Sequence, residues 1–203
     1  MVRNDADRRN ATQKESDESP DSRFKVTQRN IILRDEQKDL LYACQSIDEI
    51  IMLRLGLYSG LRVSEMVNLC PKDLDKTREV IRIRDAKGGK DRFACIDRAT
   101  MQILIAIAHE RSLEPDEPFL KTTTRTLQRW FDSLQDRAWG QKKYSPHDMR
   151  HTNITMLLEE GMDLNAVKDH AGHEDIRTTE IYTHFTVKKR VISYQKAVSG
   201  GLL

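Results

Sequence analysis

Residues 79–97 read EVIRIRDAKGGKDRFACID, and this stretch decides the fold class. Three β-branched residues near its start favour an extended strand, and the adjacent Gly88 and Gly89 permit a tight turn. An extended pattern resumes at Arg92. The stretch therefore predicts a β-hairpin with a charged, exposed tip at residues 87–90.

On both sides of this hairpin, apolar residues recur every three or four positions, which is the spacing of one helix face. Glycine and proline residues interrupt the pattern and mark where helices end. The pattern predicts a long first helix from Arg34, with one break at most, and then helical segments at 61–69, 99–111, 124–139, 147–160, 163–170, 178–182 and 187–198. We therefore expect a mainly helical α+β fold with one small antiparallel sheet.

Length and composition narrow the class of protein. A chain of 203 residues suits one domain, or one domain plus a tail, and 38% hydrophobic residues supply one sizeable core. Lys plus Arg number 34 and Asp plus Glu 32, so an anion site must come from local placement and not from net charge. No run approaches the ~18 apolar residues of a membrane helix, and we expect a soluble, cytoplasmic protein.

The beginning of the chain differs from the rest. Residues 1–30 are mostly polar, and large apolar side chains are almost absent from them. Such a segment cannot offset its ordering entropy by burial. We expect residues 1–30 to form a disordered tail and residues 31–203 to form one domain.

The first polar cluster is GLRVSE at residues 60–65. It places Arg62 in the first turn of a helix, where a positive charge opposes the helix dipole. A bound anion, or the carboxylate of Glu65 three residues on, would explain this arginine. The alternative is an ordinary surface ion pair.

The second cluster is HDMRH at residues 147–151, where His147, Arg150 and His151 share one helix face. This donor-rich face suits a phosphate, because a guanidinium is a planar fork of donors that stays charged. Zinc is the rival ligand for two histidines at this spacing. The segment lacks the glutamate of an HExxH helix, and the guanidinium would repel a dication, so we expect no metal site.

The third cluster is HAGHEDIRTTEIYTHF at residues 170–185. Tyr182 follows His173 by nine residues, so a turn and a short helix can bring the phenol beside the imidazole. Taken alone, Tyr182 has a plainer explanation as a packed aromatic residue with its hydroxyl at the surface.

In this order, the clusters resemble the tyrosine recombinases, also called the phage integrase family. The motifs that carry the resemblance are GLRVSE, AKGGKDR in the hairpin, SPHDMRHT, and AGHEDIRTTEIYTH, and together they span about residues 31–190. The resemblance implies the tyrosine recombinase catalytic-domain fold. It also implies a site-specific recombinase that cuts and rejoins DNA strands through a 3′-phosphotyrosyl intermediate, with no metal, no ATP and no other cofactor.

The resemblance also assigns roles to residues. Tyr182 would attack the DNA phosphodiester, Lys87 would protonate the leaving 5′ oxygen, and arginines and histidines would bind the phosphate. The implied catalytic residues are Arg62, Lys87, His147, Arg150, His173 and Tyr182. Glu65 would orient an arginine or a histidine. His151 would pack its helix or orient a catalytic residue, and would not itself act on the substrate. The residues expected to attract the DNA backbone are Lys90, Arg92, Lys142 and Lys143.

This chain departs from the family pattern in three places. Ala171 replaces the usual leucine before Gly172, and Lys90 is an alternative to Lys87 as the hairpin lysine. The residues before Arg34 are too few for the N-terminal core-binding domain that family members usually carry. We therefore expect either the catalytic domain of a longer integrase or a minimal recombinase.

The implied partners are double-stranded DNA and further copies of this chain. We expect a tetrameric assembly on DNA, with the amphipathic helix at 186–198 as one candidate contact and packing on its own domain as the other. Two alternative functions stay open at this point. One is a type IB topoisomerase activity, and the other is a DNA-binding regulator without catalysis.

Overall fold

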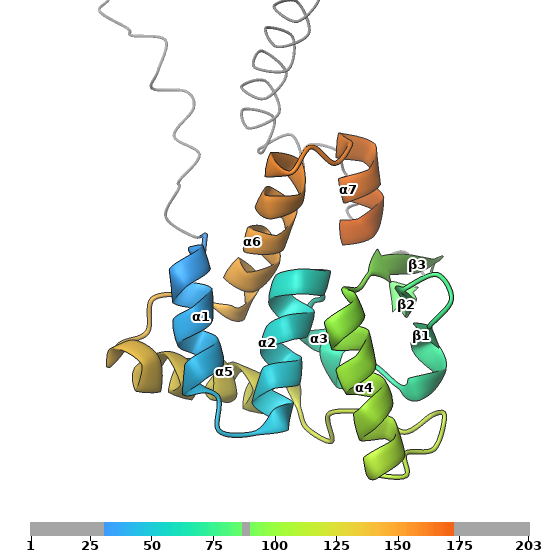
Figure 1. Cartoon of the computed structure of the whole chain (residues 1–203), viewed down its shortest axis with the longest axis horizontal. Coiled ribbons are helices and arrows are strands. Elements are labelled where there is room, and N and C mark those ends of the chain that lie inside the picture. The colour runs from blue at the N-terminus through green and yellow to red at the C-terminus, as the bar shows by residue number, and fades with distance from the viewer. Residues whose placement is uncertain (1–30, 87–89, 173–203) are drawn as a thin grey trace, which may run out of the picture.

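The computed structural model describes residues 31–86 and 90–172, and this part of the chain is mainly helical with one small antiparallel sheet (Figure 1). Its elements are α1 (Arg34–Ala43), α2 (Ile47–Ser59), α3 (Val63–Val67), the 3-10 helix η3 (Pro71–Asp73), β1 (Leu74–Asp75), β2 (Val80–Ala86), β3 (Lys90–Cys95), α4 (Arg98–Glu110), α5 (Thr124–Trp139), α6 (Pro146–Glu159) and α7 (Leu164–Ala171). The predicted fold class is confirmed. The tail, the hairpin tip at 87–89 and the helices expected at 178–182 and 187–198 lie outside the described residues.

The sheet contains the predicted hairpin. Strands β2 and β3 pair antiparallel, with Arg82 opposite Phe93 and Ile81 opposite Ala94, and the register shifts between Ile83 and the hairpin tip. Alternate residues point to opposite faces, so Ile81 and Ala94 are buried whereas Arg82 and Phe93 are exposed. Strand β1 is a third strand, at the edge of the sheet beside β2. The sequence pattern did not predict it, because a strand of two residues is too short to show a period.

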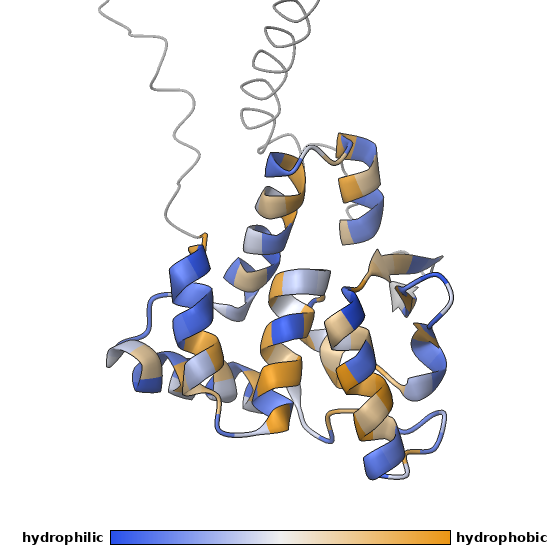
Figure 2. Cartoon of the chain, in the orientation of Figure 1, coloured by the Kyte–Doolittle hydropathy of each residue, from blue (hydrophilic) through white to orange (hydrophobic). Residues whose placement is uncertain are grey.

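Helix α2 lies at the centre of the fold and packs against α1, α3, α4, α5 and α6. It is buried on almost all sides, as a helix with apolar residues around its circumference must be. Figure 2 shows this as a concentration of hydrophobic colour along α2 and α4. Gly56 allows α6 to approach closely, because a Cβ atom there would lie 2.8 Å from the Met149 sulfur.

The long helix expected from Arg34 is two helices, α1 and α2, separated at residues 44–46. Ser46 begins the second one, since its side chain accepts a hydrogen bond from the Glu49 N–H. Helix α2 ends at Gly60, which has a φ of 62°. A Cβ atom on Gly60 would lie 2.6 Å from Asn153 Oδ1, so the turn that leads to Arg62 requires glycine on two counts.

Helix α7 packs against β3 and α6, although about 70 residues separate it from the hairpin (Figure 1). Asp163 begins α7 by accepting hydrogen bonds from two backbone N–H groups, and Gly172 ends it with a φ of 62°. The C-terminal end of α7 therefore lies beside the sheet and the start of α3. Within the described residues, no helix has the length and apolar character needed to cross a membrane.

Candidate functional site

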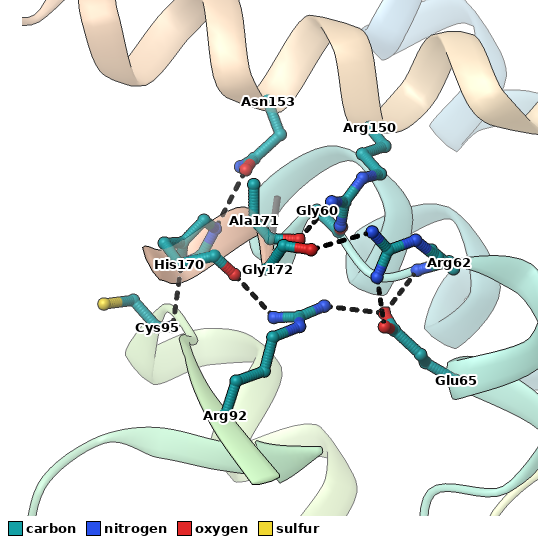
Figure 3. Close-up of polar contacts among 10 residues, drawn as sticks. All are labelled: Gly60, Arg62, Glu65, Arg92, Cys95, Arg150, Asn153, His170, Ala171 and Gly172. Carbon is teal, nitrogen blue, oxygen red and sulfur yellow. Dashed lines mark hydrogen bonds and ion pairs between the residues drawn. The ribbon is translucent and has the colours of Figure 1, made fainter. Parts of the chain in front are cut away.

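Three arginines converge on the C-terminal end of α7 (Figure 3). They come from α3, β3 and α6, and each donates to a different one of three successive backbone carbonyls. The pairs are Arg92 Nη1 with His170 O at 2.5 Å, Arg150 Nη2 with Ala171 O, and Arg62 Nη2 with Gly172 O at 3.0 Å. The end of a helix carries partial negative charge, so these carbonyls are a favourable place for cations.

One carboxylate, that of Glu65, joins two of these arginines. It accepts from the Arg62 backbone N–H at 2.7 Å, from Arg62 Nη1 at 2.8 Å and from Arg92 Nη2 at 2.7 Å. Burial alone would raise the pKa of Glu65, but Arg92 and Arg62 outweigh it and hold this pKa below the usual range. The three guanidinium groups and this one carboxylate together carry an excess of positive charge.

The arginines differ in how far they can be reached. The Arg62 side chain is 28% exposed, whereas Arg150 is 2% exposed. Arg150 also donates from Nη1 to the Gly60 carbonyl at 2.6 Å, so it holds the ends of α2 and α7 together. An anion can therefore contact Arg62 directly, whereas Arg150 is almost completely covered.

Helix α6 carries two histidines, His147 and His151, close in sequence to Arg150, and the two imidazole rings contact each other. The rings of His147 and His151 meet edge to face, with centroids 4.9 Å apart. Burial and the charge of Arg150 lower the pKa of His147, and burial and His147 lower the pKa of His151. Both imidazoles are therefore mainly neutral at pH 7. His147 is the exposed one of the two.

His170 is a buried polar residue of this region that the sequence did not assign to the site. Its Nδ1 accepts a hydrogen bond from the Cys95 N–H at 3.0 Å, so the ring proton is on Nε2, which lies 3.0 Å from Asn153 Oδ1. Burial, with help from two neighbouring guanidinium groups, lowers the pKa of His170 to about 4. The neutral ring ties α7 to both β3 and α6.

The structure brings together the predicted residues Arg62, Glu65 and Arg150, and Glu65 orients arginines rather than histidines. It corrects one expectation. Arg92 was expected to attract DNA from the hairpin surface, but its side chain is 8% exposed and bonded to Glu65 and to the His170 carbonyl. The reason is the strand period, because Arg92 points to the same face as Ala94, which is buried.

The remaining predicted residues are placed as follows. Lys142 and Lys143 lie on the connection between α5 and α6, on the opposite side of α2 from the sheet in Figure 1, and they pair with Asp132 and Glu36. Lys90 begins β3, whereas Lys87, His173 and Tyr182 lie outside the described residues.

A surface groove of about 720 Å³ begins at Arg62 and follows β2. Arg82 and Arg84 line it, with side chains that are 56% and 36% exposed. Asp91 and Asp73 pair with these two arginines, so the groove combines positive and negative groups. Among the described residues, no group of three or more His, Cys, Asp or Glu side chains could hold a metal ion.

Comparison with known proteins identifies the relatives of this chain. A model of the phage integrase family matches residues 30–189. Tyrosine recombinase XerA of Thermococcus kodakarensis is 35% identical over 179 residues, which are 82% of this chain and 62% of that protein. Tyrosine recombinase XerA of Saccharolobus solfataricus is 30% identical over 160 residues, which are 79% of this chain and 54% of that protein. The chain thus spans a little over half the length of these relatives.

Solved structures agree with the sequence comparison. The crystal structure of XerA recombinase superposes with a TM-score of 0.69 at 28% identity, covering 81% of this chain and 64% of that one. The catalytic domain of bacteriophage HP1 integrase gives a TM-score of 0.64 at 20% identity, covering 84% of this chain and 94% of that domain. The second match shows likeness of fold alone, and it fits the predicted catalytic-domain fold.

Proposed function

Because this chain belongs to the phage integrase family, we propose that it acts in site-specific DNA recombination, cutting and rejoining strands through a 3′-phosphotyrosyl intermediate. The relatives named tyrosine recombinases support this proposal. XerH, whose fold resembles this one, is described as bound to its difH substrate, which supports DNA as the partner. The covalent intermediate conserves the bond energy, so the reaction consumes no ATP.

The observation that carries the proposal is the positive charge at the end of α7. Phosphoryl transfer adds negative charge to the non-bridging oxygens in the transition state, and positioned donors that meet this charge lower the barrier. Arg62 is partly exposed, so an incoming phosphate can contact it. Arg150 lies deeper and is bonded to the same end of α7 as Arg62. The groove from Arg62 along β2 offers a path for the strand on one side of that phosphate.

The proposed reaction proceeds in two balanced steps. The Tyr182 oxygen attacks phosphorus, the bond from phosphorus to the 5′ oxygen breaks, and Lys87, or alternatively Lys90, gives that oxygen a proton. His147 and His173 hydrogen-bond the phosphate, and one of these imidazoles accepts the proton that the Tyr182 hydroxyl loses. In the second step, a 5′-hydroxyl of another strand attacks phosphorus and gives its proton to the hairpin lysine, the bond from phosphorus to the Tyr182 oxygen breaks, and the phenol takes back its proton. The roles of Lys87, His173 and Tyr182 rest on the sequence motifs.

We further propose that copies of the chain assemble on DNA, with four copies joining two duplexes and the segment 186–198 making one of the contacts. The alternative is that this segment packs on its own domain. The same proposal locates the protein in the cytoplasm, together with the DNA on which it acts.

A suicide substrate tests the proposed activity. Nicked duplexes of randomised sequence are incubated with the protein, and covalent adducts are captured and sequenced, because the target sequence is unknown. We expect adducts with the wild-type chain and none with Tyr182→Phe, which keeps the ring and loses the nucleophile. Absence of wild-type adducts would favour a regulator without catalysis.

The captured sequence then separates recombination from topoisomerase activity. Two labelled duplexes that carry it should exchange strands if the chain is a recombinase. Relaxation of supercoiled DNA without exchange between duplexes would instead indicate that each strand is resealed to itself.

A further inference from the structure

We propose that Arg92 is a positioning residue for the phosphate site: it fixes the orientation of Arg62 by binding Glu65 and the end of α7, the two places where Arg62 is anchored. This inference rests on the proposed recombinase function. Arg92 touches no DNA in this proposal, since its side chain is 8% exposed.

The contacts of Arg92 lead to Arg62 by two routes (Figure 3). By the first, Arg92 Nη2 binds Glu65 Oε2 at 2.7 Å, and that same oxygen accepts the Arg62 backbone N–H at 2.7 Å. By the second, Arg92 Nη1 binds the His170 carbonyl, two residues before the Gly172 carbonyl that accepts from Arg62 Nη2. Loss of Arg92 therefore loosens both anchors of Arg62 at once.

The position of Arg92 on its strand shows that packing alone does not account for it. The buried side chains that follow on the same face of β3 and just beyond it are Ala94 and Ile96, which are apolar. A buried charge costs more to desolvate than an apolar side chain, and replacing such groups by apolar residues is often neutral or stabilising. Within the described residues, Arg92 Nε is also buried without a hydrogen-bond partner. A role of Arg92 in the proposed site therefore explains its presence better than a contribution to the stability of the core does.

The fit of Arg92 against the end of α7 is close. A Cβ atom on Gly172 would overlap the Arg92 side chain, so the helix end and the arginine occupy adjoining space without slack. Lysine in place of Arg92 would keep the charge but not the planar fork that bonds Glu65 and a carbonyl together. Outer-shell groups that orient metal ligands typically contribute about 10- to 100-fold to activity, and we expect an effect of the same order from a group that orients Arg62.

The test compares wild type, Arg92→Lys and Arg92→Met by the rate of adduct formation in a single turnover on the captured duplex. Arg98→Met is the matched control, because Arg98 is 79% exposed and pairs with Glu79 away from the site. We expect both Arg92 variants to be about 10- to 100-fold slower, with DNA affinity unchanged, and the control to match wild type. Wild-type rates in Arg92→Lys and Arg92→Met would overturn the proposal.

A neutral substrate separates positioning from a general loss of structure. A methylphosphonate at the scissile position replaces one charged non-bridging oxygen by a methyl group, so less charge needs to be met by Arg62. We expect the deficit of the Arg92 variants to shrink on this substrate, as it should for Arg62→Ala. An equal deficit on both substrates would show a structural role and overturn the inference. Absence of adducts from wild type would instead refute the proposed function. Arg92→Lys keeps the charge, so it serves if Arg92→Met fails to fold.

Discussion

Replacement of Glu65 by glutamine tests whether the arginine cluster depends on its one carboxylate. Glu65→Gln keeps the shape of the side chain and one carbonyl oxygen, and it removes the charge that Arg62 and Arg92 share. The guanidinium groups of Arg62 and Arg92 would then lie near each other without the carboxylate that they now share, while Arg150 stays bonded to the neighbouring carbonyl of α7.

The expected cost follows from burial. The Glu65 side chain is 9% exposed and the Arg92 side chain is 8% exposed, so the pair is a buried one. Removing one member of a buried pair typically costs about 3 to 5 kcal/mol. The amide oxygen can still accept one of the three hydrogen bonds, and Arg62 at 28% exposed recovers some solvation, so we expect about 2 to 3 kcal/mol. Since domains are stable by about 5 to 15 kcal/mol, the variant should still fold.

Urea denaturation of wild type and Glu65→Gln at several pH values measures this difference. The folded-state pKa of Glu65 is lowered from 4.5, so its contribution is fully present above pH 4.5 and is lost as the pH falls through the folded pKa. The two proteins should therefore differ at pH 7 and converge in acid. The matched control is Glu160→Gln, because Glu160 is 71% exposed in its pair with Arg34, and we expect a change below about 0.5 kcal/mol.

Two results would refute this reasoning about Glu65. One is a difference at pH 7 no larger than that of the control. The other is a difference that stays unchanged as the pH falls from 4.5 through the folded pKa of Glu65, because protonated Glu65 carries no charge to lose. Glu65→Gln makes the net charge of the protein more positive by one unit, so its DNA binding should not weaken. Its adduct formation should nevertheless be slower than that of wild type.

Further predictions concern single residues of the site. Arg62→Ala should slow adduct formation at least about 100-fold in single-turnover assays, and EDTA should leave the wild-type rate unchanged. Gly60→Ala should lower the melting temperature, at a cost of about 1 to 2 kcal/mol for the left-handed backbone plus the clash with Asn153, seen by circular dichroism. His170→Gln should remove part of the loss of stability between pH 6.5 and 4, since the unfolded state binds this proton first, as thermal unfolding at several pH values would show.

The helices could be predicted from the sequence wherever their signals are local. Helix α5 was predicted at 124–139 and is observed at Thr124–Trp139, because Thr123 begins it, Gly140 ends it and an apolar stripe lies between. The division between α1 and α2 was less clear, since only Ser46 marks it. Strand β1 had no local signal and exists through its pairing with β2.

The site could be predicted in part from the sequence. The main error of the prediction, the role of Arg92, could have been avoided. The motifs identified Arg62, Glu65 and Arg150, whose residue types suit a phosphate. Arg92 was expected to attract the DNA backbone, which requires an exposed side chain. The alternation of β3, however, places it on the same face as buried Ala94, so the strand period already indicated an inward side chain.

The bonds to the end of α7 could not have been predicted from any pattern of residues. They join positions 78, 21 and 110 residues apart, and their acceptors are backbone carbonyls, which every residue has. The arrangement thus depends on where the fold places α7 and not on the side chains at 170–172. Substitution of the Ala171 side chain by a small residue should leave the three bonds intact. A displacement of α7 along its axis would break all three together, so the packing of α7 on β3 and α6 supports the proposed phosphate site.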